Sequence, residues 1–160
     1  MDRATIISKR INENIENLES YVNQYKILTA RVSTSILDKS DENMVFNTIQ
    51  EIGFKFKQTS NSTKDKIQGL SNLLSLNLNA KEKDVIKWHI NAHSRKLISL
   101  TNLFRDYNFE FKKNEENRTK FLYRAANLDA SDEQINEYLK SPGSNKKLVH
   151  FFLWETNLKN

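Results

Sequence analysis

The sequence has few of the residues that interrupt helices. Its 160 residues include three glycines, one proline and no cysteine. This scarcity favours an all-helical protein, because glycine and proline both destabilise helix interiors. The lack of cysteine excludes a disulfide framework and thiol chemistry. The length is that of one ordinary domain, or of one domain with a tail.

The chain also lacks a long apolar run. Residues 1–9 contain no apolar core of the kind found in secretory signals. The longest run, Leu148–Trp154, is far shorter than the ~20 residues that span a bilayer. We therefore expect the chain, as given, to be soluble. Its net charge of +5 permits an anionic partner, but the charge is too dispersed to indicate nucleic acid.

The polar residues form no recognisable catalytic pattern. No pair of carboxylates shares an apolar environment, no serine has an evident histidine and acid partner, and no glycine-rich loop precedes a helix. His89 and His93 lie one helical turn apart, a spacing that can bind a metal. No acidic residue completes an H-E-x-x-H pattern, and His93 falls on an apolar stripe. We expect both histidines to be structural, and we expect no metal, no other cofactor and no enzymatic activity.

Long apolar stripes dominate the sequence instead. The longest one recurs in alternating steps of four and three residues, the 3.5-residue repeat of coiled coils and helix bundles. Its positions are Ile86, Ile90, His93, Leu97, Leu100, Phe104, Tyr107, Phe111, Asn114, Arg118, Phe121, Ala125 and Leu128. The stripe covers about 43 residues, or roughly 65 Å of helix. Burial of so long a stripe predicts equally long partner helices.

Two earlier stripes supply those partners. The first helix is expected to begin near Asp2, a plausible N-cap. Its stripe positions are Ile11, Ile15, Leu18, Val22, Tyr25, Thr29, Val32 and Ile36. The second helix is expected to begin with Ser40 or Asp41 as its N-cap. Its stripe positions are Val45, Ile49, Ile52, Phe56, Thr59, Thr63, Lys66 or Ile67, Leu70 and Leu74.

Capping patterns delimit the remaining helices. Asn79 and Glu82 have the form of a capping box that begins the third helix, which should end near Asn127. Ser131 and Gln134 form a second box before a short helix.

Three long stripes joined by short turns predict an all-α fold. The expected architecture is an up-down-up antiparallel three-helix bundle with an extended third helix and a short C-terminal helix. We assign residues 1–128 to the bundle, 129–141 to the short capped helix, and 142–160 to a linker or tail. The apolar cluster of that tail is expected to dock on the bundle.

Four stretches of the third helix and its C-terminal side resemble the syntaxin family. They are Ser94–Leu97, Asp106–Lys113, Asn117–Arg118 and Leu128–Ile135. Their order and spacing are similar to a Ser-Arg-Lys-apolar stretch, an acidic-aromatic-basic turn, a basic residue before the helix end, and a cap with Ser, an acid and Glu. The resemblance covers roughly residues 5–140 and is most specific over residues 94–139. It identifies the chain as similar to the N-terminal Habc domain of a Qa-type t-SNARE.

The resemblance implies a non-catalytic regulatory domain in vesicle docking, membrane fusion and exocytosis. In the family this domain binds the SNARE helix of its own chain and proteins of the Sec1/Munc18 class, and meets other SNAREs indirectly. The full-length protein would lie on the cytosolic face of the plasma membrane or an endomembrane, attached by a C-terminal anchor. The present sequence contains neither SNARE heptads nor an anchor, so we interpret it as a fragment.

The resemblance also implies a partner-binding groove between the second and third helices. Ten residues on the outward faces of these helices are the candidates for it: Phe54, Gln58, Asn61, Asp65, Gln68, Arg95, Ser99, Asn102, Asp106 and Phe109. A fourth amphipathic helix bound there would complete a four-helix assembly.

The basic residues leave a second interpretation open. Nine of them could form a positive strip on the second and third helices: Lys55, Lys57, Lys64, Lys66, Lys81, Lys83, Lys87, Arg95 and Lys96. Interleaved acidic residues favour an ordinary solvated face over a strip. The alternative function is a BAR-like helical module that binds the surface of an anionic membrane.

Overall fold

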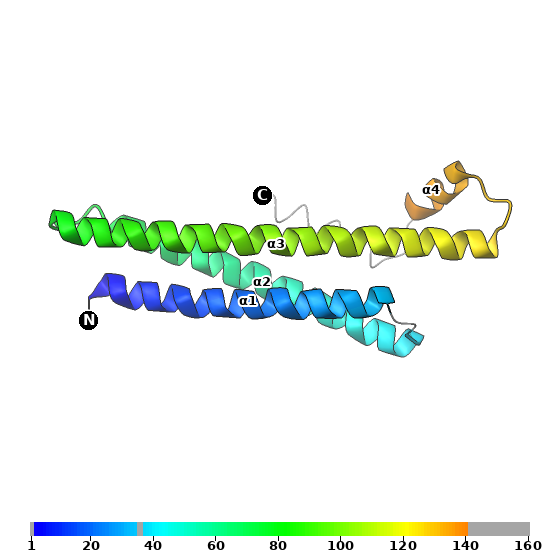
Figure 1. Cartoon of the computed structure of the whole chain (residues 1–160), viewed down its shortest axis with the longest axis horizontal. Helices are drawn as coiled ribbons and strands as arrows, with labels where there is room; N and C mark the ends of the chain where they lie inside the picture. Colours follow the sequence, from blue (N-terminus) through cyan, green and yellow to red (C-terminus); the bar gives the residue numbers. More distant parts are fainter. Residues whose placement is uncertain (1, 35–36, 141–160) are drawn as a thin grey trace.

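The computed structural model describes residues 2–34 and 37–140, which form four α-helices. They are α1 (Arg3–Thr34), α2 (Lys39–Leu73), α3 (Ala80–Ala126) and α4 (Asp132–Lys140). The three long helices lie side by side, with α2 running opposite to α1 and α3 (Figure 1). The predicted all-α bundle with an extended third helix and a short C-terminal helix is confirmed. Residues 142–160, the predicted tail, lie outside the described residues.

Side-chain caps fix where three helices begin, as predicted. The carboxylate of Asp2 accepts a hydrogen bond from the Thr5 amide at 2.8 Å, at the start of α1. Asn79 and Glu82 form a reciprocal capping box at the start of α3. Ser131 and Gln134 do the same at the start of α4. Each cap satisfies amide groups that the first helical turn leaves without partners.

The start of α2 differs from the prediction. Its N-cap is Asp38, whose backbone is extended and whose carboxylate accepts a hydrogen bond from the Asp41 amide at 2.8 Å. The expected caps, Ser40 and Asp41, are wrong because both lie within the first turn. Asp41 and Glu42 instead place negative charge near the positive end of the helix dipole.

The core lies where the stripes of the three long helices meet. Every stripe position of α1 within the described residues is buried: Ile11, Ile15, Leu18, Val22, Tyr25, Thr29 and Val32. Ile36 lies outside those residues. Phe104 of α3 is the aromatic centre of the core, stacked on Phe56 at 4.2 Å between ring centroids and tilted against Tyr25 at 4.5 Å.

The polar middle of α2 is part of this core. Ser60 and Thr63 are buried, and Thr59 is half-buried. The Thr63 hydroxyl donates to the backbone carbonyl of Thr59 at 2.7 Å, so it is buried with a partner. Small polar side chains therefore continue the interface at the predicted stripe positions Thr59 and Thr63.

The predicted α3 stripe holds only in part. Its positions from Ile86 to Phe111 are buried or half-buried, but Asn114 and Ala125 are exposed, as are Phe121 (71%) and Leu128 (90%). The prediction of burial up to residue 128 is wrong because the partner helices are shorter than the stripe.

Two contacts show where those partners end. Asn114 reaches Ser33 near the end of α1, and Arg118 reaches Glu42 in the first turn of α2. The C-terminal end of α3 extends past both helices (Figure 1). There α3 contacts α4, where the Tyr123 and Tyr138 rings stack at 4.6 Å.

Candidate partner-binding surface

The ten candidate residues are all exposed, five on α2 and five on α3. We call them together the outer face: Phe54, Gln58, Asn61, Asp65 and Gln68 of α2, with Arg95, Ser99, Asn102, Asp106 and Phe109 of α3. None of these ten side chains packs in the core. On α2, the exposed Gln68 side chain donates a hydrogen bond to Asn72. Their role in binding stays a prediction.

The core aromatics determine which way the outer face points. Residues two positions apart on a helix point about 200° apart. Phe56 and Phe111 are buried, so Phe54 and Phe109 are turned to solvent, with exposed fractions of 58% and 57%. The Phe56 ring of α2 stacks on the Phe104 ring of α3, and this contact fixes how each helix is rotated about its axis. It therefore also fixes the directions in which their exposed sides point.

Phe54 and Phe109 are not the most exposed large apolar side chains of the described residues, since Trp88 and Phe121 are exposed at 67% and 71%. Contiguous exposed apolar patches rimmed by polar residues typically mark interaction sites, whereas single exposed apolar side chains are common. Asp106 lies one turn before Phe109, and Arg95 lies on the same side of α3 about 21 Å further toward the start of the helix. Neither Arg95 nor Asp106 forms an ion pair with a described residue. The outer face thus carries two exposed aromatic rings together with charged side chains that form no ion pair within the part of the chain that the structure describes.

The predicted positive strip is interrupted. Lys55 pairs with Glu51 at 3.2 Å, and Lys96 pairs with Glu19 of α1 at 3.0 Å. Lys66 donates to the Ser62 hydroxyl. These contacts direct basic side chains along the bundle rather than into one continuous strip, which favours the interpretation as an ordinary solvated face.

The two histidines meet a residue that the sequence did not single out. The Ser8 hydroxyl of α1 lies 2.8 Å from Nε2 of His93 and 3.1 Å from Nδ1 of His89. Burial lowers the pKa of His93, and the neighbouring His89 lowers it further. This arrangement ties α1 to α3. Within the described ranges, no group of three potential ligands is placed to hold a metal ion.

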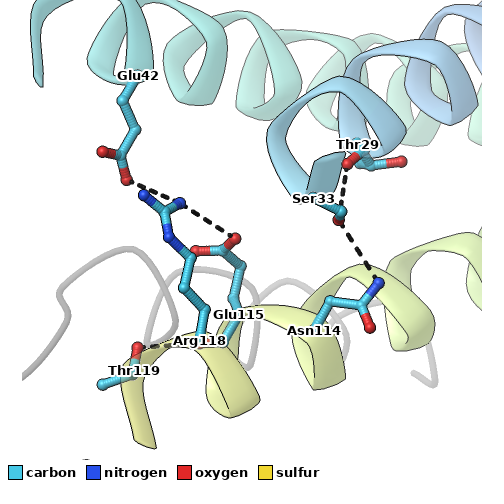
Figure 2. Close-up of polar contacts among 7 residues, drawn as sticks. All are labelled: Thr29, Ser33, Glu42, Asn114, Glu115, Arg118 and Thr119. Atoms are coloured by element: carbon cyan, nitrogen blue, oxygen red, sulfur yellow. Dashed lines mark hydrogen bonds and ion pairs between the residues drawn. The ribbon is translucent and has the colours of Figure 1, made fainter. Parts of the chain in front are cut away.

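A cluster of charges joins α2 to α3 at the other end of the bundle. Figure 2 shows Arg118 between Glu42 of α2 and Glu115 of its own helix, at 3.4 and 3.7 Å. Glu115 is buried, whereas the stripe predicted burial of Asn114. Arg118 links Glu115 to Glu42 on α2, and a contact of this kind between helices cannot be inferred from the repeat within α3.

Sequence reasoning also missed a cavity at the end of the bundle where α1 and α3 begin. It has a volume of about 400 Å³, and none of the ten outer-face residues lines it. No described helix has both the length and the apolar character needed to cross a membrane.

Comparison with known proteins shows a likeness at the level of the fold. No family model matches this chain, and no curated protein matches it either. Among solved structures, the chain is similar to a chain of the Unc18–syntaxin 1 complex from Monosiga brevicollis, with a TM-score of 0.73. The similarity covers 99% of this chain and 73% of that chain, at 14% sequence identity. At this identity the likeness shows a shared fold.

Proposed function

We propose that this chain is the N-terminal Habc-type regulatory domain of a syntaxin-like t-SNARE, acting without catalysis in vesicle docking and membrane fusion. The observation that carries the proposal is the likeness of its fold, over nearly the whole chain, to a chain of an Unc18–syntaxin 1 complex. The stretches over residues 94–139 that resemble syntaxins support it independently.

The outer face is the surface by which such a domain would work. A three-helix bundle with a fixed α2–α3 pair can accept a fourth amphipathic helix, which would bury its apolar stripe against the exposed aromatics. Phe54 and Phe109 would be the anchors, since large aromatic side chains carry much of the binding energy in protein interfaces. Arg95 and Asp106 would select the partner through charge.

Two partners follow from this proposal. One is the SNARE motif of the same protein, held against the domain in a closed form. The other is a Sec1/Munc18-type protein. The domain would then regulate when the SNARE motif is accessible to other SNAREs, on the cytosolic face of the membrane that carries the full-length protein.

Charge reversal tests the outer face directly. The double variant Arg95→Glu/Asp106→Lys should weaken binding to a Sec1/Munc18-type protein by about tenfold or more, equivalent to about 1.4 kcal/mol. The melting temperature should change little, because both side chains are exposed. Isothermal titration calorimetry measures the binding, and circular dichroism measures the melting.

A matched variant on α1 provides the control. Arg10→Glu/Glu13→Lys also reverses one charge of each sign at exposed positions, but on a helix outside the outer face. It should bind like the wild type. Equal weakening by both double variants would contradict the assignment of the outer face, and loss of fold in the first would contradict its exposure.

The transcript tests the family assignment separately. Sequence read beyond Asn160 should encode a further heptad stretch with a central Gln, and then about 20 apolar residues. A stop codon at that point would contradict the assignment to an anchored t-SNARE. Salt-sensitive binding of this chain to anionic liposomes, with dimerisation, would instead favour the BAR-like alternative.

A further inference from the structure

The cavity of about 400 Å³ lies where α1 begins, α2 ends and α3 begins. Its apolar lining comes from Ala4, Leu73, Leu76, Leu78, Val85 and Ile86. Pockets for small ligands typically have volumes of 300–1,000 Å³, a mostly apolar lining and a few polar groups. The cavity matches this description in its volume and in its six apolar lining residues. Its other six lining residues are polar, and four of these are charged: Asp2, Arg3, Lys81 and Glu82.

The segment between α2 and α3 builds one wall of the cavity. The Leu78 amide donates to the carbonyl of Leu76 at 2.9 Å, and Asn79 then caps α3. These bonds hold Leu76 and Leu78 in a short, defined connection rather than a free loop. Leu76 and Val85 nevertheless remain about half exposed, at 47% and 48%, so the apolar lining is incompletely covered by the chain itself.

Two of the four charged side chains at the cavity already accept hydrogen bonds from the backbone, and the other two do not have a described partner. The carboxylates of Asp2 and Glu82 both accept hydrogen bonds from backbone amides, of Thr5 at 2.8 Å and of Asn79 at 3.3 Å. The Thr5 hydrogen bonds lower the pKa of Asp2, which keeps its carboxylate ionised and engaged in the cap. Arg3 and Lys81 also line the cavity, and neither forms a hydrogen bond or ion pair with another described side chain.

Arg3 and Lys81, which have no described side-chain partner, lie beside an apolar cavity. Together they complement an anion with an aliphatic chain. We propose that this cavity binds a fatty-acid-like monocarboxylate, with the chain among the leucines and the carboxylate facing Arg3 and Lys81. The chain would gain by leaving water, and the carboxylate would gain charge-assisted hydrogen bonds. The site is separate from the outer face and does not depend on the proposed function.

A series of ligands on the full 160-residue chain tests the proposal. Hexanoate, octanoate and decanoate, kept below their micellar concentrations, are titrated by calorimetry and followed by ¹H–¹⁵N NMR. Each added methylene should tighten Kd about fourfold while the chain stays within the cavity. Octanoate should bind more tightly than 1-octanol, which has the same chain without the charge.

Two variants separate the contributions of charge and cavity. Arg3→Gln/Lys81→Gln should weaken octanoate binding about tenfold or more, and should change 1-octanol binding less than twofold. Loss of fold is not expected, since cations at helix N-termini are unfavourable and removing them is stabilising if anything. Ala4→Leu should fill the cavity and weaken both ligands. The controls are Lys9→Gln/Arg10→Gln and Ala92→Leu, the same substitutions at exposed positions away from the cavity.

Several outcomes would overturn the proposal. It fails if octanoate does not bind saturably, if Kd is independent of chain length, or if Ala4→Leu binds like Ala92→Leu. Equal affinity for octanoate and 1-octanol would refute the role of Arg3 and Lys81. Binding to vesicles of anionic phospholipid that requires these cations, without saturable binding of octanoate, would assign the surface to a membrane instead.

Discussion

Replacing Tyr25 by phenylalanine would remove one oxygen atom from the centre of the bundle. The hydroxyl donates to Oδ1 of Asn108 on α3 at 2.7 Å, and both residues are almost completely buried. Burial raises the pKa of Tyr25 far above its ordinary value, so the hydroxyl remains protonated and acts as a donor. The Nδ2 group of Asn108 has no hydrogen-bond partner among the described residues.

The expected cost follows from what the substitution leaves behind. In Tyr25→Phe, neither polar end of the buried Asn108 amide would have a partner, which costs about 1–3 kcal/mol. Asn108→Leu should cost a similar amount, because it leaves the Tyr25 hydroxyl buried without an acceptor. The double variant removes both polar groups and should be more stable than the sum of the single changes predicts, by about 1 kcal/mol or more.

Urea unfolding of the wild type, the two single variants and the double variant gives the coupling energy between Tyr25 and Asn108 as a double-mutant cycle. The slope of free energy against urea should be the same in all four, so that the midpoints report stability alone. Tyr107→Phe provides the control, since Tyr107 is only half-buried and its hydroxyl has no described hydrogen bond; it should change stability by less than about 0.5 kcal/mol. Simple additivity, or a neutral Tyr25→Phe, would refute the reasoning.

Three further predictions concern stability. Because the pKa of His93 is lowered in the folded protein, the unfolded chain binds a proton more readily, and the free energy of unfolding should fall as pH falls through about 6.5. In His93→Gln, urea unfolding between pH 5 and 8 should show a weaker pH dependence. An unchanged pH dependence would contradict the lowered pKa of His93. Asn79→Ala removes the side-chain cap of α3 and should cost about 1 kcal/mol in the same assay, whereas a neutral result would show that the capping box contributes nothing. Phe111→Ala should lower the free energy of unfolding by about 3–5 kcal/mol, but Phe121→Ala by less than about 0.5 kcal/mol, because only Phe111 is buried. Similar losses in both variants would indicate that the buried stripe continues to Phe121, as the sequence predicted.

The sequence was sufficient for the architecture because the relevant signals are local. Alternating steps of four and three residues identify a buried stripe within one helix, and caps such as Asn79–Glu82 act over three residues. Both can be read without knowing what lies across the bundle. The exposed positions of the outer face follow in the same way, since they are the sides opposite the stripes.

What the sequence could not show depends on where other helices end. The repeat continues through Phe121 and Leu128 with no local sign that α1 stops at Thr34. Ser8 gave no signal either, since its role arises from histidines more than 80 positions away. The cavity forms between residues 2–5 and residues 73–89, which are about 70 positions apart, so no single stretch could indicate it.

The buried polar pairs explain why these helices adopt one register. A stripe of leucine and isoleucine alone would tolerate a shift by one heptad, since apolar contacts have little directionality. Between α1 and α3, Ser8 meets His93 near one end and Tyr25 meets Asn108 further along. A shift by seven residues would separate both pairs and bury four polar side chains without partners, at a cost of several kcal/mol.

Between α2 and α3, the ion pair of Arg118 with Glu42 restricts the register in the same way. Because both interfaces of α3 are fixed in register, Phe54 and Phe109 keep a constant relative position on the surface of the bundle.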